Sequence, residues 1–306
     1  MALRNSLQKQ ADALTLPELE AARKRTSAES TGFAYPPAAP VFYVKFGNQS
    51  KSLTNMEART QEFVYTALKD LPDVYAPRVP RIFRVVEGRY LAYVIMELVH
   101  EPTLLELSET RSWEEQQPYL KQIARAIDVL LTIPVVGDVP GPCGGGVIQH
   151  PLFRDGQAPA IFPSTAALQG HINAINSHRN AASSQITLES CLHVVYSDCF
   201  PGNFVLPPDG SLWILDFGHA GLLPLSFQAY ALSYPFPRSR AVARAIGGYM
   251  TTVLPRGNLE LMRRAHDRFS QYMFGFGLKE GEMFHGDDGS EEEEEEGGEE
   301  EENKGK

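Results

Sequence analysis

Three residues with oxygen-bearing side chains lie close together in the segment YSDCFPGNFVLPPDGSLWILDFGHAG, which runs from Tyr196 to Gly221. They are Asp198, Asn203 five residues later, and Asp216, which opens an Asp-Phe-Gly triplet. A carboxylate can accept or orient the proton of a hydroxyl group, and an amide oxygen together with a second carboxylate can hold Mg²⁺ against phosphates. The order and spacing of these residues therefore predict phosphoryl transfer to a hydroxyl group.

The residues between Asn203 and Asp216 predict a β-hairpin. Phe204–Leu206 and Leu212–Leu215 are apolar runs suited to strands, and Pro207–Gly210 between them is a strong turn signal. Such a hairpin brings both metal-binding candidates to the same end of a small sheet.

The same segment resembles the aminoglycoside phosphotransferase and choline kinase-like families, as a fungal-type member. Their shared pattern is His-Gly-Asp, two residues, Pro-Gly-Asn, and later Ile-Asp-Phe-Gly. The positions of this chain that match it are Asp198, Pro201, Gly202, Asn203, Asp216 and Gly218. The chain departs from the pattern at Tyr196-Ser197, where the families have His-Gly and the His normally braces the loop.

The resemblance implies an α+β, bilobal protein-kinase-like fold, with a small antiparallel-sheet N-lobe and a mainly helical C-lobe. It also implies ATP and Mg²⁺ as cofactors and a hydroxyl compound, a small molecule, as acceptor. In that arrangement Asp198 orients the acceptor, and Asn203 and Asp216 hold the metal.

A lysine upstream completes the set of residues that such a site needs. Lys45 lies on the predicted strand Val41–Phe46, where it would bind the α- and β-phosphates. A helix predicted over Asn55–Lys69, with Thr54 as its cap, follows this strand.

A glutamate on that helix would fix Lys45 by an ion pair. Glu57, in the predicted first turn, is favoured for this role because fungal members of the resembled families show Glu-Ala with a bulky apolar residue six positions later, as Glu57-Ala58 and Phe63 do. Glu62 is the alternative, and an unpaired, solvated Glu57 is a third reading.

The nucleotide side is predicted from the order of the remaining strands. Val79–Val86 and Tyr90–Leu98 complete a small antiparallel sheet, and the run from Met96 to Val99 is the hinge. Met96, Glu97 and Val99 are the residues predicted to contact the adenine. A glycine-rich hairpin over the phosphates is not evident, since only Gly32 precedes Lys45 at a suitable distance.

The C-lobe is predicted to be built from four helices joined by irregular segments. Residues 133–165 are rich in Gly and Pro, and their Gly141–Gly146 run is interpreted as a flexible loop, with an anion cradle as the other reading. The predicted helices are Trp113–Thr132, Ser164–Asn176, Ser239–Val253 and Leu259–Phe274.

Composition divides the chain into a nearly neutral body and an acidic tail. Of the formal net charge of −10, residues 291–306 supply ten Glu and two Lys, or −8. We expect the tail, residues 286–306, to be disordered, and it is a candidate contact for basic proteins. The predicted organisation is an N-terminal extension (1–34), an N-lobe (35–99), a C-lobe (100–285) and this tail.

Several classes of protein are disfavoured by the same reading. No basic stripe suggests nucleic-acid binding, and no apolar run reaches membrane-spanning length, so a cytoplasmic protein without either partner is expected. Two alternatives to an enzyme stay open. One is a catalytically silent kinase-like binding or scaffold protein, because Tyr196 replaces His and the glycine loop is missing; the other is an acidic-tailed interaction protein.

Overall fold

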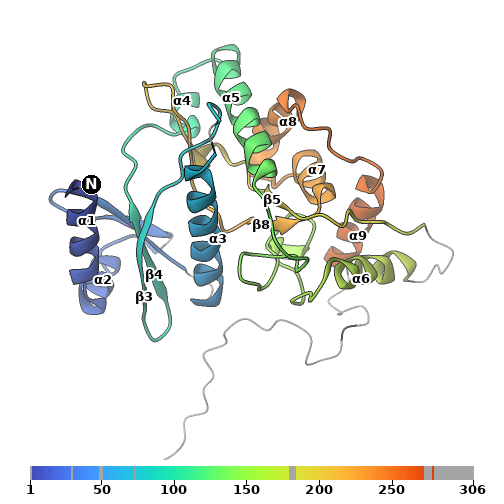
Figure 1. Ribbon diagram of the computed structural model, residues 1–306, viewed down its shortest axis with the longest axis horizontal. Helices are drawn as coiled ribbons and strands as arrows, with labels where there is room; N and C mark the ends of the chain where they lie inside the picture. Colours follow the sequence, from blue (N-terminus) through green and yellow to red (C-terminus); the bar gives the residue numbers. More distant parts are fainter. Residues whose placement is uncertain are drawn as a thin grey trace, which may run out of the picture.

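The computed structural model divides into two lobes joined by a hinge (Figure 1). The predicted acidic tail lies outside the described residues, and so does the end of the last predicted helix. The residues that the structure describes are 2–28, 30–47, 51–71, 73–178, 184–271 and 278.

A four-stranded antiparallel sheet forms the N-lobe. Its strands lie in the order β1-β2-β4-β3, and the central pair aligns Lys45 with Val94. Its edge strand β1 was not predicted, because its four residues stand between a polar linker and the prolines at 36, 37 and 40. The strands are β1 (Gly32–Tyr35), β2 (Phe42–Phe46), β3 (Ile82–Glu87) and β4 (Ala92–Glu97).

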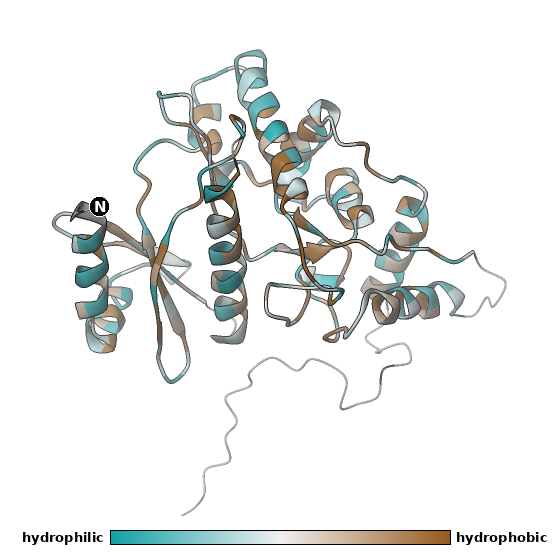
Figure 2. Ribbon diagram, in the orientation of Figure 1, coloured by the Kyte–Doolittle hydropathy of each residue, from teal (hydrophilic) through white to brown (hydrophobic). Residues whose placement is uncertain are grey.

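The alternation of side chains along β2 decides which way Lys45 points. Phe42, Val44 and Phe46 are buried against helices α1 (Ala2–Ala13) and α2 (Leu16–Arg23). Because successive side chains of a strand point to opposite faces, Tyr43 and Lys45 lie on the other face, which α3 (Lys51–Lys69) covers. Figure 2 shows the apolar strands between these mostly hydrophilic helices.

The helix that carries Glu57 begins earlier than the sequence predicts. α3 starts at Lys51 and not at Asn55, so Thr54 lies inside the helix, where it is buried, and is not its cap. Glu57 consequently stands in the second turn and not the first. The prediction erred because residues 51–54 carry no apolar periodicity of their own.

One long helix organises the C-lobe. α5 (Trp113–Thr132) has the predicted bounds, and half of its residues are buried, six of them in the largest apolar core. Ser112 caps it reciprocally with Glu115, each side chain accepting a hydrogen bond from the other residue's backbone N–H. The other C-lobe helices are α4 (Leu104–Ser108), α6 (Thr165–Ser177), α7 (Leu225–Ser233), α8 (Arg240–Tyr249) and α9 (Leu259–Gln271).

Two short strand pairs lie beneath the hinge and carry the predicted catalytic segment. β6 (Phe204–Val205) and β7 (Trp213–Ile214) form the predicted hairpin, and β5 (His193–Tyr196) pairs with β8 (Ala220–Leu223). The segment from 133 to 164 contains one short 3₁₀ turn, η1 (Arg154–Gly156). Two further 3₁₀ turns, η2 (Pro201–Asn203) and η3 (Pro237–Ser239), lie beside Asp198.

These two lobes, with an antiparallel sheet, a lysine strand and a covering helix above a helical body, confirm the α+β protein-kinase-like fold predicted from the sequence. Among the described residues, no helix combines the length and the apolar character needed to span a bilayer.

Candidate functional site

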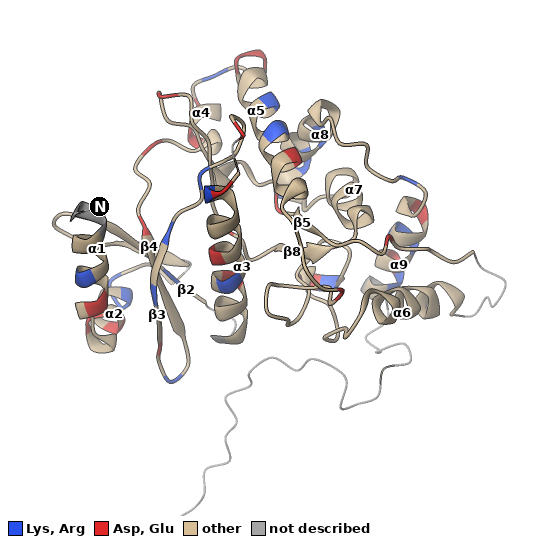
Figure 3. Cartoon of the chain, viewed as in Figure 1, with Lys and Arg blue, Asp and Glu red and all other residues tan. Residues whose placement is uncertain are grey.

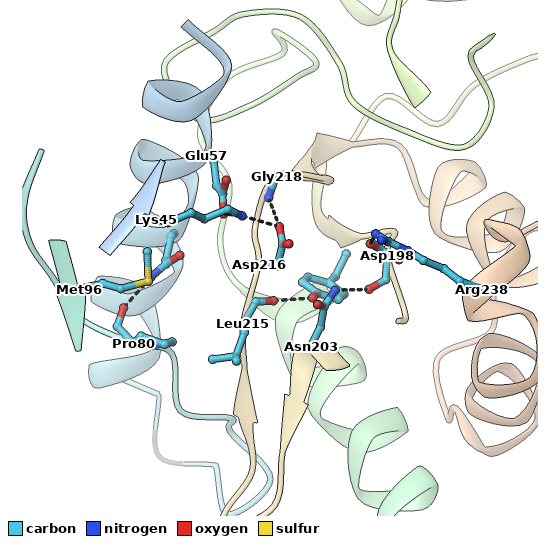
Figure 4. Close-up of polar contacts among 12 residues, drawn as sticks. Lys45, Glu57, Pro80, Met96, Asp198, Asn203, Leu215, Asp216, Gly218 and Arg238 are labelled. Carbon is cyan, nitrogen blue, oxygen red and sulfur yellow. Dashed lines mark hydrogen bonds and ion pairs between the residues drawn. The ribbon is translucent and has the colours of Figure 1, made fainter. Parts of the chain in front are cut away.

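Lys45 forms an ion pair with Glu57 across the N-lobe. The Lys45 Nζ atom lies 2.7 Å from Glu57 Oε1, and both side chains are largely buried. Glu62, the alternative partner, is exposed on the same helix, so α3 turns Glu57 and not Glu62 toward the strand. Figure 4 shows the pair facing Asp216.

Asp216 reaches the same lysine from the C-lobe hairpin. Its Oδ1 lies 3.0 Å from Lys45 Nζ and accepts a hydrogen bond of 3.3 Å from the Gly218 N–H. The Phe217 N–H in turn hydrogen-bonds Glu57. Asp216 holds a φ of +57°, a left-handed conformation that Asp tolerates better than most residues. The Asp-Phe-Gly turn is thus tied to both members of the ion pair.

The three charges of this cluster shift one another's pKa. Burial disfavours the charged form of Lys45, yet the two carboxylates outweigh it and raise the pKa of Lys45. Burial raises the pKa of Glu57 despite the nearby ammonium group. For Asp216 burial is outweighed by the charge and hydrogen bond of Lys45 together with the Gly218 N–H and His219, so its pKa is lowered. Two carboxylates share one cation, so the cluster has an uncompensated negative charge that a further cation would neutralise.

Asn203 is tied to the Asp198 loop and to the hairpin, and its side-chain oxygen is a candidate ligand. Its Nδ2 donates to the Asp198 carbonyl oxygen at 3.1 Å, and its own carbonyl oxygen accepts from the Leu215 N–H at 2.8 Å. The Asn203 side chain also contacts the Tyr196 hydroxyl, and Asn203 and Asp216 line one pocket.

This donor set fits Mg²⁺. One amide oxygen and one carboxylate oxygen are hard ligands, and Mg²⁺ is usually held by one or two carboxylates with phosphate oxygens and water completing the octahedron. No group of three or more His, Cys, Asp or Glu side chains able to hold a metal occurs in the described part of the chain. A metal here would depend on nucleotide phosphates for its remaining ligands.

Tyr196 braces the loop at the position where the resembled families have His. Its hydroxyl donates to the Leu215 carbonyl oxygen at 2.6 Å, directly before Asp216. Its ring lies edge-on to Phe217, with ring centres 5.6 Å apart. The Gln228 side chain accepts a hydrogen bond from the Tyr196 N–H and donates one to the Tyr196 carbonyl oxygen. The larger phenol therefore connects the Asp198 loop to the Asp-Phe-Gly turn.

Asp198 is buried and has both carboxylate oxygens engaged. Arg238 Nη2 lies 2.6 Å from Oδ2, and Ser239 Oγ donates to Oδ1 at 2.9 Å. The Asp198 side chain is 2% exposed, whereas that of Arg238 is 57% exposed and stacks over the Phe200 ring. Arg238 thus closes the solvent side of the aspartate (Figure 4).

Neither Arg238 nor Ser239 was predicted at this site from the sequence. They follow a proline-rich stretch, and Arg238 lies 40 residues from Asp198 in the chain. An Arg-Ser pair is too common to be informative, so only the tertiary structure finds it.

A pocket of about 400 Å³ extends from the ion pair to the hinge. Met96, Glu97 and Val99 all line it. Within the described residues, the backbone groups of Leu98 and Val99 make no hydrogen bond, so they are available to an adenine edge. The Met96 side chain is buried and its sulfur accepts from Gln61 of α3, which limits the depth of the pocket.

One strand, and not a glycine-rich hairpin, covers the far end of this pocket. β1 runs antiparallel to β2, and Gly32 pairs with Lys45. A Cβ atom at Gly32 would stand 2.4 Å from the Tyr43 hydroxyl oxygen, so only glycine leaves room for that ring. The Tyr43 side chain occupies part of the roof, beside Thr31.

The Gly141–Gly146 segment is anchored to α3, contrary to its interpretation as a flexible loop. Arg59 donates to the carbonyl oxygens of Cys143 and Gly145, and Thr60 Oγ1 accepts from the Cys143 N–H. At its other end, Gly141 exchanges two backbone hydrogen bonds with Leu222 of β8. The segment therefore links the helix of Glu57 to the strand after Asp-Phe-Gly.

Comparison with known proteins yields likeness of structure only, because no protein-family model and no curated protein matches the chain. A ternary complex of an aminoglycoside phosphotransferase with streptomycin and ATP shows 15% identity and a TM-score of 0.48, over 87% of this chain and 94% of that one. An aminoglycoside phosphotransferase from Streptomyces rimosus shows 14% identity and a TM-score of 0.44, over 82% of this chain and 96% of that one. A putative fructosamine-3-kinase from Haemophilus somnus shows 11% identity and a TM-score of 0.42, over 77% of this chain and 80% of that one. Such low values carry no functional argument.

Proposed function

We propose that the protein is an ATP- and Mg²⁺-dependent phosphotransferase that moves the γ-phosphate to a hydroxyl group of a small molecule. One observation carries the proposal. Lys45, Glu57 and Asp216 converge from β2, α3 and the β6–β7 hairpin, and Asn203 and Asp216 together line the pocket that reaches the hinge. An excess of carboxylate around one lysine suits a site for a metal–nucleotide complex.

Each residue then has a role that follows from its position. Lys45 binds the α- and β-phosphates and is held in place by Glu57. Asn203 and Asp216 hold Mg²⁺, which would neutralise charge on the β- and γ-phosphates when bound. Leu98 and Val99 offer backbone groups to the adenine, Glu97 lines the pocket beside them, and Met96 bounds the pocket behind it.

Asp198 is the residue that faces the acceptor. The acceptor oxygen forms a bond to the γ-phosphorus, the bond from that phosphorus to the β–γ bridging oxygen breaks, and ADP leaves with those electrons. The hydroxyl proton passes to the Asp198 carboxylate. For this step, Arg238 or Ser239 must yield one carboxylate oxygen to the acceptor hydroxyl.

The silent scaffold is the second candidate, and the engaged state of Asp198 favours it. Tyr196 no longer supports that reading, because its hydroxyl and ring brace the loop as the histidine does in the resembled families. The missing glycine hairpin leaves the phosphates less covered, which bears on affinity.

Calorimetric titration of the full chain with ATP, with and without Mg²⁺, tests the proposal. Magnesium-dependent binding that Asp216→Asn loses is expected. Asp209→Asn is the matched control, because Asp209 lies exposed at the tip of the same hairpin. No binding at millimolar ATP by folded protein would overturn the phosphotransferase proposal and leave the scaffold.

A further inference from the structure

A second cavity, of about 660 Å³, lies in the C-lobe and is larger than the pocket at the hinge. Its walls come from η1, the end of α7, the residues before η3, the first turns of α8, and α9. None of the residues proposed to bind phosphate, metal or adenine lines this cavity.

The unpaired charge on its wall is positive. Arg240 and Arg244 stand one turn apart on α8, are exposed, and have no carboxylate partner in the described part of the chain. The other charged side chains of the wall largely neutralise one another. Arg263 Nη1 lies 2.8 Å from Asp267 Oδ2, and Arg263 also forms an ion pair with Glu260. Asp155 Oδ2 lies 3.4 Å from Arg154 Nε. Figure 3 shows basic residues on both α8 and α9.

The rest of the wall is largely aromatic. Tyr230 and Tyr234 lie with ring centres 5.1 Å apart, and Tyr234 is 38% exposed. Phe236 forms a further part of the wall. Phe227, another aromatic residue of this region, is buried in the core and does not line the cavity. The exposed Tyr234 ring and the half-buried Phe236 ring beside two free arginines suit a ligand with an apolar body and an anionic end.

The cavity borders the acceptor side of Asp198. The Phe236 ring lies 4.9 Å from the His219 ring, three residues after Asp216. Gly156 completes this wall with a φ of +77°, and a Cβ there would lie 3.2 Å from both rings. Two residues beyond Phe236, η3 places Arg238 on the Asp198 carboxylate.

We infer that this cavity binds the acceptor, and that the acceptor is an alcohol with an aromatic or apolar body and an anionic group held by Arg240 and Arg244. The acceptor role rests on the proposed phosphotransferase function, whereas the preference for anions does not. A polycationic acceptor is disfavoured, because the unpaired charges it would meet on the wall are positive.

Two probes of one shape and opposite charge test the inference. The full chain is titrated with 4-(hydroxymethyl)benzoate and with 4-(hydroxymethyl)benzylamine, and binding is followed by ligand-observed NMR. The carboxylate is expected to bind about tenfold more tightly than the amine, because each exposed charge pair contributes a modest attraction. The double variant Arg240→Glu, Arg244→Glu should reverse the preference, and Arg89→Glu, in the exposed β3–β4 turn, should not change it.

The outcomes separate this inference from the proposed function. Equal or tighter binding of the amine, or an unchanged preference in the double variant, overturns the anionic site even if ATP binds with Mg²⁺. A carboxylate preference that depends on Arg240 and Arg244 supports the site, even if the ATP titration fails and the phosphotransferase proposal falls. With both results positive, phosphorylation of the carboxylate alcohol is expected to exceed that of the amine about tenfold.

Discussion

Asp216 and Asp198, the two aspartates of the candidate site, differ in the lobe from which their charged partner comes. Asp216 contacts Lys45 of the other lobe through one oxygen, and its second oxygen forms no hydrogen bond within the described residues. Asp198 gives both oxygens to Arg238 and Ser239 of its own lobe. The nucleotide side is therefore completed by bringing the lobes together, and the acceptor side is already closed within the C-lobe.

This difference indicates which substitutions should affect binding and which should affect turnover. In the proposed phosphotransferase, residues around Lys45 position the phosphates, so their loss should weaken nucleotide affinity. Asp198, Arg238 and Ser239 do not line the hinge pocket, so their loss should leave nucleotide affinity unchanged and alter the reaction.

Asp198→Asn is expected to have the largest effect and to separate the two sides most sharply. Turnover should fall about 10²–10⁴-fold, the usual contribution of a general base, with ATP affinity within about twofold of wild type. Phosphate release from ATP, with water as acceptor, measures the rate, and calorimetry measures the affinity. An unchanged rate in folded protein would mean that Arg238 and Ser239 hold Asp198 out of the reaction.

Acid should weaken the acceptor side through His150. Its Nε2 lies 3.0 Å from the Phe227 carbonyl oxygen, its Nδ1 accepts from the Leu152 N–H, and its ring packs on Tyr230 of the cavity wall. Burial lowers the pKa of His150 from 6.5 to about 3.

Between pH 3 and pH 6.5 the unfolded chain binds more protons at His150 than the native protein does. Its contribution to stability is therefore complete above pH 6.5 and falls by about 1.4 kcal/mol per pH unit below it. Urea unfolding at pH 7, 6 and 5 measures the slope. His150→Gln should remove this part of the slope, and an equally steep slope in the variant would contradict the assignment.

The pairing of Lys45 can be tested with two glutamates of one helix. Glu57→Gln should weaken binding of the ATP–magnesium complex about tenfold, because it removes the charge that orients the lysine. Glu62→Gln, at an exposed position of α3, should change it less than about twofold. Equal effects of the two variants would show that the ion pair does not support nucleotide binding.

Arg59→Met is expected to have the smallest effect. It removes the hydrogen bonds that tie Cys143 and Gly145 to α3, and the free energy of unfolding should fall by about 1 kcal/mol. Urea unfolding beside Arg89→Met, an exposed arginine in the turn after β3, measures it. A loss no larger than in that control would mean that the segment does not hold α3.

Local sequence carried much of the fold and the nucleotide side. Helical periodicity fixed the bounds of α5, and the Pro-Pro-Asp-Gly turn fixed the β6–β7 hairpin. β1 and α7 were missed for different reasons. β1 is four residues between a linker and prolines, and α7 is buried on nearly every side, so it lacks an amphipathic pattern.

Other features depend on contacts between distant segments, which no local pattern encodes. The sequence pattern favoured Glu57 and left Glu62 open, and the rotation of α3 on the sheet decided between them. The anchoring of the Gly141–Gly146 segment required Arg59 of that helix, and the bracing role of Tyr196 required the carbonyl oxygen of Leu215.

By itself, the sequence determined which residues are proposed to bind phosphate and metal, because their spacing is set by one strand, one loop and one hairpin. Only the tertiary structure decided that Arg238 and Ser239 occupy Asp198, and that Arg240 and Arg244 give the cavity beside it a positive wall. Arg238 and Ser239 follow the aspartate by about 40 residues, and they reach it because α8, which begins directly after them, packs against α5 and α7.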